Sequence, residues 1–491
     1  MPKAPIHFQT ISEQAKLIRK RLVSPVALVE AYLERIEALD VHLRAFNTVL
    51  GEMALLSAKA AEREVAAGKY RGALHGIPIA VKDQMNITGV PNTSGSRVYL
   101  SNVATSDATV IRRLRRAGAI LLGTLSTHEF HIGPTQHFLR GTPRNPWDLK
   151  RTPGGSSSGA GSAVAAGMCS AAIGGDTGGS IRGPAAYCGV SGMRPTWSRV
   201  SRHGVFPLAW SMDAIGPLAR SADDCAVILQ AIGGRDGQDR TTTRQRATAF
   251  DSELTRDIGN LTIGLVDEMM DEMPDREVRS AISDSAETLR RAGARVENVS
   301  IPILRQPILF LHAATVEAEA ASYHWPALKE RYFDLDRNTR VRLVAAAALP
   351  SVFHVYANRL RAAIAADLIA AFRKFDILIG PHRGPAPLIK PRPRVRSHRA
   401  ATNDLLGLGT GIATAFSMAG VPCAAIPCGL SHDGLPLSLH LAGGPMRDST
   451  LLRVCHAFQA VTDWHLLRPD VGHLQADDSA NNLPSAARAR A

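Results

Sequence analysis

The sequence predicts an α/β fold built on one large mixed β-sheet. Short apolar runs typical of buried strands alternate along the chain with longer amphipathic stretches typical of helices, which is the pattern of an α/β protein. These runs recur on both sides of a polar connector at residues 233–249, which favours one large domain over two separate ones. The chain has 491 residues, 45% of them apolar, and this is enough for such a domain.

The first 70 residues are expected to form a helical layer that packs on the core. Ser24-Pro25 has the form of a helix start, with a capping side chain followed by proline in the first turn. Behind it, apolar residues recur at helical spacing from Val26 to Ile36. An amphipathic layer of this kind is also a candidate face for a homodimer.

Residues 71–470 are expected to form the main domain, and its first strand carries a polar tip. The apolar run at 77–81 predicts a buried strand that ends at Lys82, and a helix at 110–117 and a strand at 119–122 follow. Residues 471–491 are polar and rich in alanine and arginine, which predicts a disordered tail. Beyond the connector, the predicted strands are 261–266, 294–299, 376–380 and 422–427, and the predicted helices are 277–292 and 310–375.

The net charge of +13, from 57 Lys and Arg against 44 Asp and Glu, is compatible with an anionic partner. The excess is spread along the chain, however, and its densest cluster is interrupted by prolines, which favours a solvated loop. Nucleic acid is therefore not expected as a partner. The residues of this cluster are Lys390, Arg392, Arg394, Arg396 and Arg399.

Cysteine spacing and hydropathy further limit the kinds of protein that this sequence can be. The six cysteines are scattered singly, without the paired spacing of a zinc site or the framework of a disulfide-rich protein. The N-terminus lacks the apolar segment of a signal peptide, and no run of about 18 apolar residues occurs. A reducing, cytoplasmic setting is expected, with no membrane contact and no metal ion.

Two glycine-flanked serine turns carry the most informative chemistry. They are residues 154–159 (Gly-Gly-Ser-Ser-Ser-Gly) and residues 174–182 (Gly-Gly-Asp-Thr-Gly-Gly-Ser-Ile-Arg). Glycine beside serine leaves backbone amides uncovered, as an oxyanion hole requires. Serine needs a base to become a nucleophile, and neither turn contains a histidine. Lys82 is the better candidate, because burial at a strand end would lower its pKa and let it act as a neutral base.

These segments resemble the amidase signature family, which includes fatty acid amide hydrolase, peptide amidase and the glutaminase subunit of the tRNA-dependent amidotransferase. The resemblance covers most of the chain, and it implies an amidase-signature fold with a large mixed sheet covered by helices on both faces. Besides the two serine turns, the matching stretches are Gly76–Asp83, Arg144–Trp147, Pro184–Gly189, Ser201–Pro207 and Gly216–Ser221.

Matched position by position, the family's catalytic triad falls on Lys82, Ser156 and Ser180. Ser180 corresponds to the nucleophile, and Ser156 corresponds to the bridging serine that the family holds after a cis peptide bond. The family's oxyanion hole consists of backbone amides before the nucleophile, together with that of the nucleophile itself. These amides belong here to Thr177, Gly178 and Gly179.

The resemblance implies that the protein hydrolyses a small-molecule carboxylic amide through an acyl-enzyme, without a cofactor. Neutral Lys82 takes a proton from Ser156, which takes one from Ser180 as Ser180 attacks the amide carbonyl. The relay then returns a proton to the leaving amine, and water hydrolyses the acyl-enzyme. Esters and carbamates pass through similar tetrahedral intermediates, so they are further candidate substrates.

Three other motifs give weaker predictions. Residues 155–159 fit Gly-x-Ser-x-Gly with Ser157 as the nucleophile, but no buried strand precedes them. The glycines at 407–411 lack the spacing of a nucleotide-binding loop. His128 and His131 are three residues apart and do not form a His-Glu-x-x-His metal motif.

Two alternatives differ from a free-standing amidase in their biological role. One is the glutaminase-type subunit of a tRNA-dependent amidotransferase, and the other is a catalytically silent protein of the same fold, which the intact triad positions disfavour. Residues 300–400 resemble the variable pocket region of free-standing amidases, which favours the free-standing role. Specificity is expected from residues 130–140 and 300–400, with the apolar segments 309–311 and 352–353 as candidate pocket walls.

Overall fold

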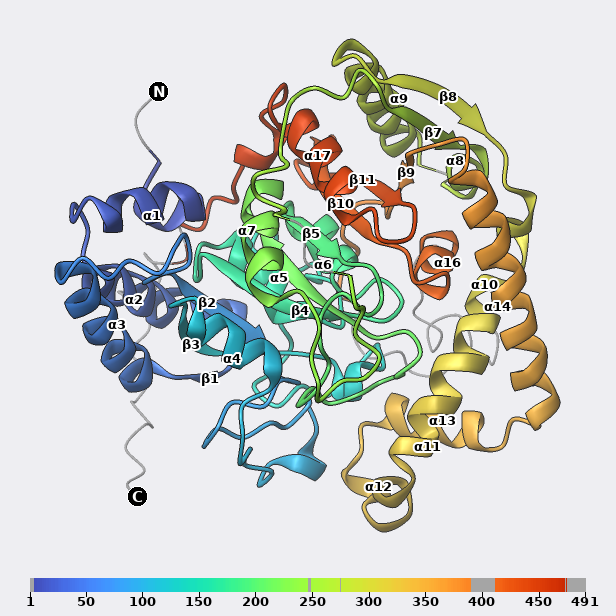
Figure 1. The fold of residues 1–491 in the computed structure, drawn as a ribbon. Helices are drawn as coiled ribbons and strands as arrows, with labels where there is room; N and C mark the ends of the chain where they lie inside the picture. The colour runs from blue at the N-terminus through green and yellow to red at the C-terminus, as the bar shows by residue number, and fades with distance from the viewer. Residues whose placement is uncertain (1–3, 246–248, 274, 390–410, 473, 475–491) are drawn as a thin grey trace.

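The computed structural model describes residues 4–245, 249–273, 275–389, 411–472 and 474. Within them, an 11-stranded mixed sheet has the strand order β1-β3-β2-β4-β6-β5-β10-β11-β9-β7-β8 (Figure 1). The predicted large mixed sheet is thus confirmed. The strands are β1 (Phe46–Val49), β2 (Pro78–Lys82), β3 (Ile120–Leu125), β4 (Ala171–Asp176), β5 (Ser191–Arg194), β6 (Ala214–Ala219), β7 (Thr262–Val266), β8 (Arg295–Val299), β9 (Ile377–Pro381), β10 (Cys423–Leu430) and β11 (Pro436–Gly443).

Strand direction changes across the sheet. Strand β2 runs parallel to both β3 and β4, and β7 runs parallel to both β8 and β9. The central strands β4, β6, β5, β10, β11 and β9 are each antiparallel to the next in the sheet. Because β2 and β4 are parallel neighbours, their carboxyl ends lie at the same edge of the sheet.

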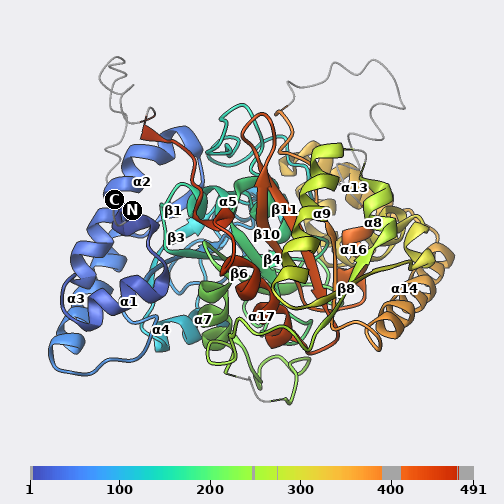
Figure 2. The same ribbon diagram turned by 90° about the horizontal axis from the view of Figure 1, so that it is seen from above.

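Helices cover both faces of the sheet, as predicted (Figure 2). Helices α5 (Ser158–Ala165) and α6 (Arg182–Cys188) pack against each other and against the central strands. Helices α7 (Ala222–Ile232) and α17 (Asp448–Gln459) lie together across the opposite face, next to β5, β6, β10 and β11. Strands β2, β4, β5 and β6 are buried along their whole length because they are covered on both sides.

The N-terminal residues form helices α1 (Ile11–Arg19), α2 (Pro25–Leu43) and α3 (Gly51–Ala66). The predicted start of α2 is confirmed, since the Ser24 side chain accepts hydrogen bonds from the amides of Val26 and Ala27. The expectation of a purely helical stretch is wrong at residues 46–49, which form the edge strand β1 beside β3. Four residues are too few to show a periodicity in the sequence.

Residues 300–375 form a second layer of helices with its own apolar core. The predicted helical character of 310–375 is confirmed, with one π-helical turn at Ala313–Glu317. The helices are α10 (Ile308–His312), α11 (Ala318–Tyr323), α12 (Trp325–Glu330), α13 (Arg337–Ala347) and α14 (Ser351–Ala371). They lie side by side at one end of the sheet, coloured yellow to orange in Figure 1. The other α-helices of the described residues are α4 (Thr109–Arg116), α8 (Asp267–Glu272), α9 (Arg276–Arg291) and α16 (Ile412–Met418).

Three of the sequence predictions lie outside the described residues. They are the basic cluster at 390–399, most of the glycine-rich segment at 407–411, and most of the predicted tail at 471–491. At its start the prediction of disorder is wrong, since Val471 and Leu474 are buried against the core. Across the helices that the structure does describe, none combines the length and the apolar character needed to cross a bilayer.

Candidate active site

The sheet edge at the ends of β2 and β4 positions the candidate base. Strand β2 ends at Lys82, and β4, its parallel neighbour, ends at Asp176. Strand β6 is antiparallel to β4, with Ala214 opposite Asp176, so Asp213 also lies at this edge. One lysine and two carboxylates therefore converge where the turn of residues 177–181 begins.

Lys82 is enclosed at this edge and contacts the first serine turn. Its side chain is 1% exposed, and its Nζ donates a hydrogen bond to Ser156 Oγ at 2.8 Å. Burial lowers the pKa of Lys82 to about 7, although the charges of Asp213 and Asp176 oppose part of that shift. A substantial fraction of Lys82 is therefore neutral at physiological pH, and neutral amine is the form that accepts a proton.

Gly155 allows the Ser156 turn to lie against a histidine. A Cβ atom at residue 155 would come within 2.1 Å of His128 Nε2, so no larger residue fits without displacement. His128 Nδ1 accepts a hydrogen bond from the Thr135 amide at 2.9 Å, which places the ring proton on Nε2, next to this turn. The Gly155–Ser156 peptide bond is cis, as the resemblance implies.

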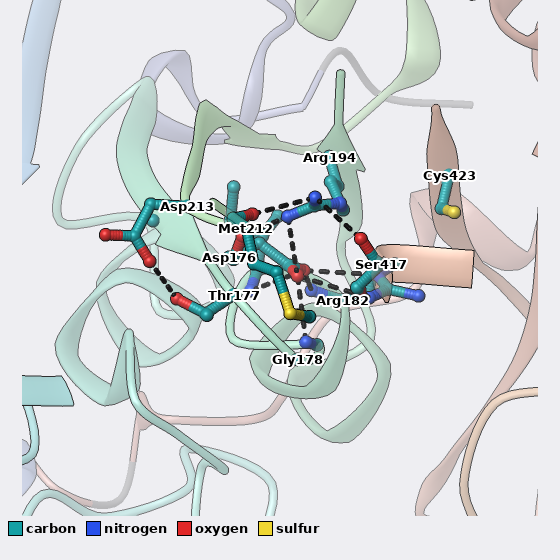
Figure 3. A network of polar contacts seen from close by, with 12 residues as sticks. Asp176, Thr177, Gly178, Arg182, Arg194, Met212, Asp213, Ser417 and Cys423 are labelled. Carbon is teal, nitrogen blue, oxygen red and sulfur yellow. Dashed lines mark hydrogen bonds and ion pairs between the residues drawn. The ribbon is translucent and has the colours of Figure 1, made fainter. Parts of the chain in front are cut away.

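Asp176 organises the second serine turn. It accepts hydrogen bonds from the Gly179 amide at 2.8 Å and from the Ile181 amide at 3.1 Å. Two buried guanidinium groups form ion pairs with the Asp176 carboxylate and balance its negative charge, that of Arg182 at 3.1 Å and that of Arg194 at 3.6 Å (Figure 3). Burial alone would raise the pKa of Asp176, but these two cations outweigh it and keep the pKa well below its usual range. The turn is thus fixed by a permanently ionised carboxylate.

The amides of this turn differ in their availability. Gly179, at φ +119°, adopts a conformation that favours glycine, and its N–H is committed to Asp176. Among the described contacts, the amides of Thr177, Gly178 and Ser180 donate to no acceptor in the protein. Of the amides expected to form the oxyanion hole, these three are free to receive an oxyanion without breaking a bond.

One cavity of about 230 Å³ brings the two serine turns together. Ser156 and Ser180 line it together with Thr177, Gly178 and Gly179, while Lys82 lies behind Ser156. Among the described contacts, none is a direct hydrogen bond between the two serine side chains. Catalytic hydrogen bonds are often long before substrate binds, so this separation does not exclude a relay.

The rest of the cavity wall comes from distant segments, and sequence reasoning did not single out their individual residues. Its ionisable members include His312, Glu317, Arg342 and Arg383, of which Glu317 and Arg342 form a buried ion pair. Burial lowers the pKa of His312 to about 4, so its ring is neutral at physiological pH. The expected specificity regions, 130–140 and 300–400, do contribute to this wall.

Three weaker predictions can be compared with the structure. Segment 352–353 does not line the cavity, since Val352 and Phe353 are exposed on the outer side of α14; segment 309–311 is also absent from its wall. Ser157, the alternative nucleophile, lies outside the cavity and is fully buried, where it donates to the carbonyl of Gly175 at 3.2 Å. His128 and His131 both line the cavity, but the described residues contain no cluster of three metal-binding side chains.

Comparison with known proteins places this geometry in a family. The sequence profile of the Amidase family matches residues 27–452. A glutamyl-tRNA(Gln) amidotransferase subunit of Moorella thermoacetica is 36% identical over 492 residues, covering 95% of this chain and 99% of that protein.

Two solved structures extend the similarity to the fold. One belongs to a vestigial protein complex that reveals the origins of an s-triazine catabolic enzyme, with a TM-score of 0.84, 32% identity, and coverage of 92% of this chain and 98% of that chain. The other is the native peptide amidase from Stenotrophomonas maltophilia, with a TM-score of 0.80, 29% identity, and coverage of 92% and 96%. The resemblance predicted from the serine turns is confirmed: this chain belongs to the amidase family.

Proposed function

We propose that this protein hydrolyses a carboxylic amide, with Ser180 as nucleophile, Ser156 as proton bridge and Lys82 as base. The observation that carries the proposal is the buried hydrogen bond of 2.8 Å between Lys82 Nζ and Ser156 Oγ, at the wall of the cavity that Ser180 also lines. The lowered pKa of Lys82, about 7, supplies a base that is neutral near physiological pH.

The proton moves in two steps through the bridge. Neutral Lys82 accepts the Ser156 hydroxyl proton, and Ser156 takes the proton of Ser180 as the Ser180 oxygen attacks the substrate carbonyl. The tetrahedral oxyanion is received by the amides of Gly178 and Ser180. Lys82, now protonated, returns the proton through Ser156 to the leaving nitrogen, and water then attacks the acyl-enzyme by the reverse route.

The amides of Thr177 and Gly179 belong to the same proposed oxyanion hole. Gly179 is held by Asp176 in the structure, so it would join only if that hydrogen bond of 2.8 Å shifted toward the substrate. The proposed oxyanion hole therefore does not depend on the Gly179 amide, although each further amide would add to the stabilisation of the oxyanion. Removing a single donor from such a hole typically costs about 10²- to 10³-fold in kcat.

In biological role, the similarities favour the glutaminase-type alternative over the free-standing amidase expected from the sequence. The amidotransferase subunit of Moorella thermoacetica is similar along nearly its whole length, at 36% identity. We therefore take the substrate to be a primary amide whose hydrolysis releases ammonia. A cavity of about 230 Å³ suits such a small group.

Ammonia release by the purified chain tests the reaction. Primary amides, including glutamine, are supplied to the wild type and to the variants Ser180→Ala and Ser157→Ala. Turnover that falls by about 10³-fold or more in Ser180→Ala, but persists in Ser157→Ala, supports the proposal. Turnover that survives in Ser180→Ala contradicts it.

The role is tested by comparing two preparations of the same chain. One is purified alone after recombinant expression, and the other is isolated with its bound proteins from the native cells. Ammonia release that requires the co-isolated proteins supports the subunit role. Equal ammonia release per mole of chain in the two preparations instead supports a free-standing amidase.

A further inference from the structure

Arg383 brings an unpaired guanidinium into the wall of the Ser180 cavity. Its side chain follows β9, is partly buried, and lines the cavity directly. The Nε atom is enclosed, yet it has no hydrogen-bond partner. The guanidinium lies 5.5 Å from the centre of the Tyr187 ring, and within the described ranges no carboxylate pairs with it.

The guanidinium lies close to the proposed nucleophile. A Cβ atom at Gly183 would meet Arg383 Nε at 3.1 Å, and one at Gly179 would meet Nη2 at 3.8 Å. These two glycines flank Ser180 in the chain, one residue before it and three after it. Arg383 can therefore contact a substrate whose carbonyl is bound at Ser180.

The other ionisable groups of the cavity wall do not carry a net charge. Glu317 and Arg342 cancel one another, since Arg342 Nε donates to Glu317 Oε1 at 2.9 Å. His312 has no partner for either ring nitrogen, and its pKa, lowered by burial to about 4, leaves it neutral. Burial likewise lowers the pKa of His128 to about 3. Arg383 thus leaves this part of the cavity with one uncompensated positive charge.

We propose that Arg383 is a specificity residue that binds a carboxylate of the substrate, so that the substrates are small anionic amides. A partly desolvated guanidinium without an anion is unfavourable, and a carboxylate accepts its N–H groups in a bidentate, charge-assisted arrangement. His312, next to Gly178, adds one donor and one acceptor but no charge. The inference rests on the proposed function at Ser180, because it names the class of amide that this site takes.

Equilibrium binding to the Ser180→Ala protein tests the inference without turnover. The ligands are malonamate, succinamate and glutaramate, each paired with a neutral isostere in which an isopropyl group replaces the carboxylate. At least one anionic amide should bind about 10- to 100-fold more tightly than its isostere, as expected for a charged hydrogen-bonded pair. Arg383→Gln in the same background should abolish that preference.

Two controls separate charge recognition from general damage. Arg383→Lys keeps the charge but not the planar fork, so it should retain part of the preference. Arg63→Gln removes an exposed arginine of α3, outside the cavity wall, and should leave the preference unchanged. The inference is overturned if no anionic amide binds more tightly than its isostere, or if Arg383→Gln weakens both ligands of a pair by the same factor. Failure of the hydrolytic proposal would appear separately, in the ammonia assay.

Discussion

The charge of Lys82 decides whether the proposed relay can start. A protonated lysine has no lone pair to accept a proton from Ser156, whereas neutral lysine has one. Because burial lowers the pKa of Lys82 to about 7, the neutral form dominates only above that pH.

Activity should therefore rise with pH through neutrality. The value of kcat/KM on a neutral amide should increase about tenfold per pH unit below pH 7 and reach a plateau above pH 8. A neutral substrate is chosen so that its own ionisation does not enter the profile. A profile that is flat from pH 5 to 9, or a midpoint near the ordinary lysine pKa of about 10.4, would exclude Lys82 as the base.

The residues of the proposed triad and those of the cavity wall differ in how far the sequence predicts them. Lys82, Ser156 and Ser180 lie in motifs whose local chemistry is visible: a lysine at the end of an apolar run, and serines between glycines. His312 and Arg383 follow no local pattern. They reach the cavity because α10 and the end of β9 fold back over the serine turns, which only tertiary structure shows.

At the level of elements, the packing of the first serine turn depends on Gly155. Gly155→Ala would place a methyl group 2.1 Å from His128 Nε2, so the turn or the ring must move. We expect a loss of about 1–3 kcal/mol in unfolding free energy, as for other overpacked sites, together with reduced activity. Chemical denaturation measures the first and ammonia release the second.

The matched control is Gly237→Ala, because a Cβ there meets no atom within 4 Å. The double variant Gly155→Ala, His128→Ala should recover part of the lost stability, since it removes the clashing ring. If Gly155→Ala is as stable and active as Gly237→Ala, close packing at this turn is not required.

The second turn depends on the buried ion pairs of Asp176. Asp176→Asn would leave the guanidiniums of Arg182 and Arg194 without their anion in a fully buried position. Breaking a buried pair in this way typically destabilises a protein by about 3–5 kcal/mol. Denaturant midpoints measure the loss. Glu287→Gln, which removes an exposed ion pair on α9, should leave the midpoint almost unchanged; an equally small effect of Asp176→Asn would contradict the structural role.

Individual strands were predictable mainly where several apolar residues follow one another, as in β2, β7 and β9. Strands β2, β3, β7, β8, β9 and β10 correspond to predicted runs. Strands β4, β5, β6 and β11 were not predicted. In β4 and β6, glycine, alanine and proline dilute the apolar pattern, as in Ala-Ala-Ile-Gly-Gly-Asp of β4. Small residues suit these positions because helices α5 and α6 pack closely against the central strands.

For the whole molecule, a buried polar network joins the N-terminal helices to the sheet. The Tyr32 hydroxyl accepts a hydrogen bond from Gln14 Nε2 at 2.8 Å and one from Ser170 Oγ, just before β4, at 3.0 Å. Tyr32→Phe should therefore lower the unfolding free energy by about 1 kcal/mol. Hydrogen exchange of α1 and α2 should accelerate by the factor that corresponds to this loss of free energy. Unchanged exchange would show that the N-terminal layer does not depend on this contact.

The sequence predicts the family better than the biological role. The serine turns are shared by amidases and amidotransferase subunits, so they specify a reaction class and a fold. Part of the cavity wall is built from residues 130–140 and 300–400, whose side chains meet only in the folded chain. For this reason the partner and the natural amide were not predictable from motifs alone.

The identity of the nucleophile is tested most directly by covalent labelling with a fluorophosphonate, followed by peptide mapping in a mass spectrometer. The adduct should form on Ser180, be absent from Ser180→Ala, and form at least about 10²-fold more slowly in Lys82→Met, which removes the base. An adduct on Ser156 or Ser157 in the wild type, or undiminished labelling of Ser180→Ala, would contradict the proposed Lys82–Ser156–Ser180 relay.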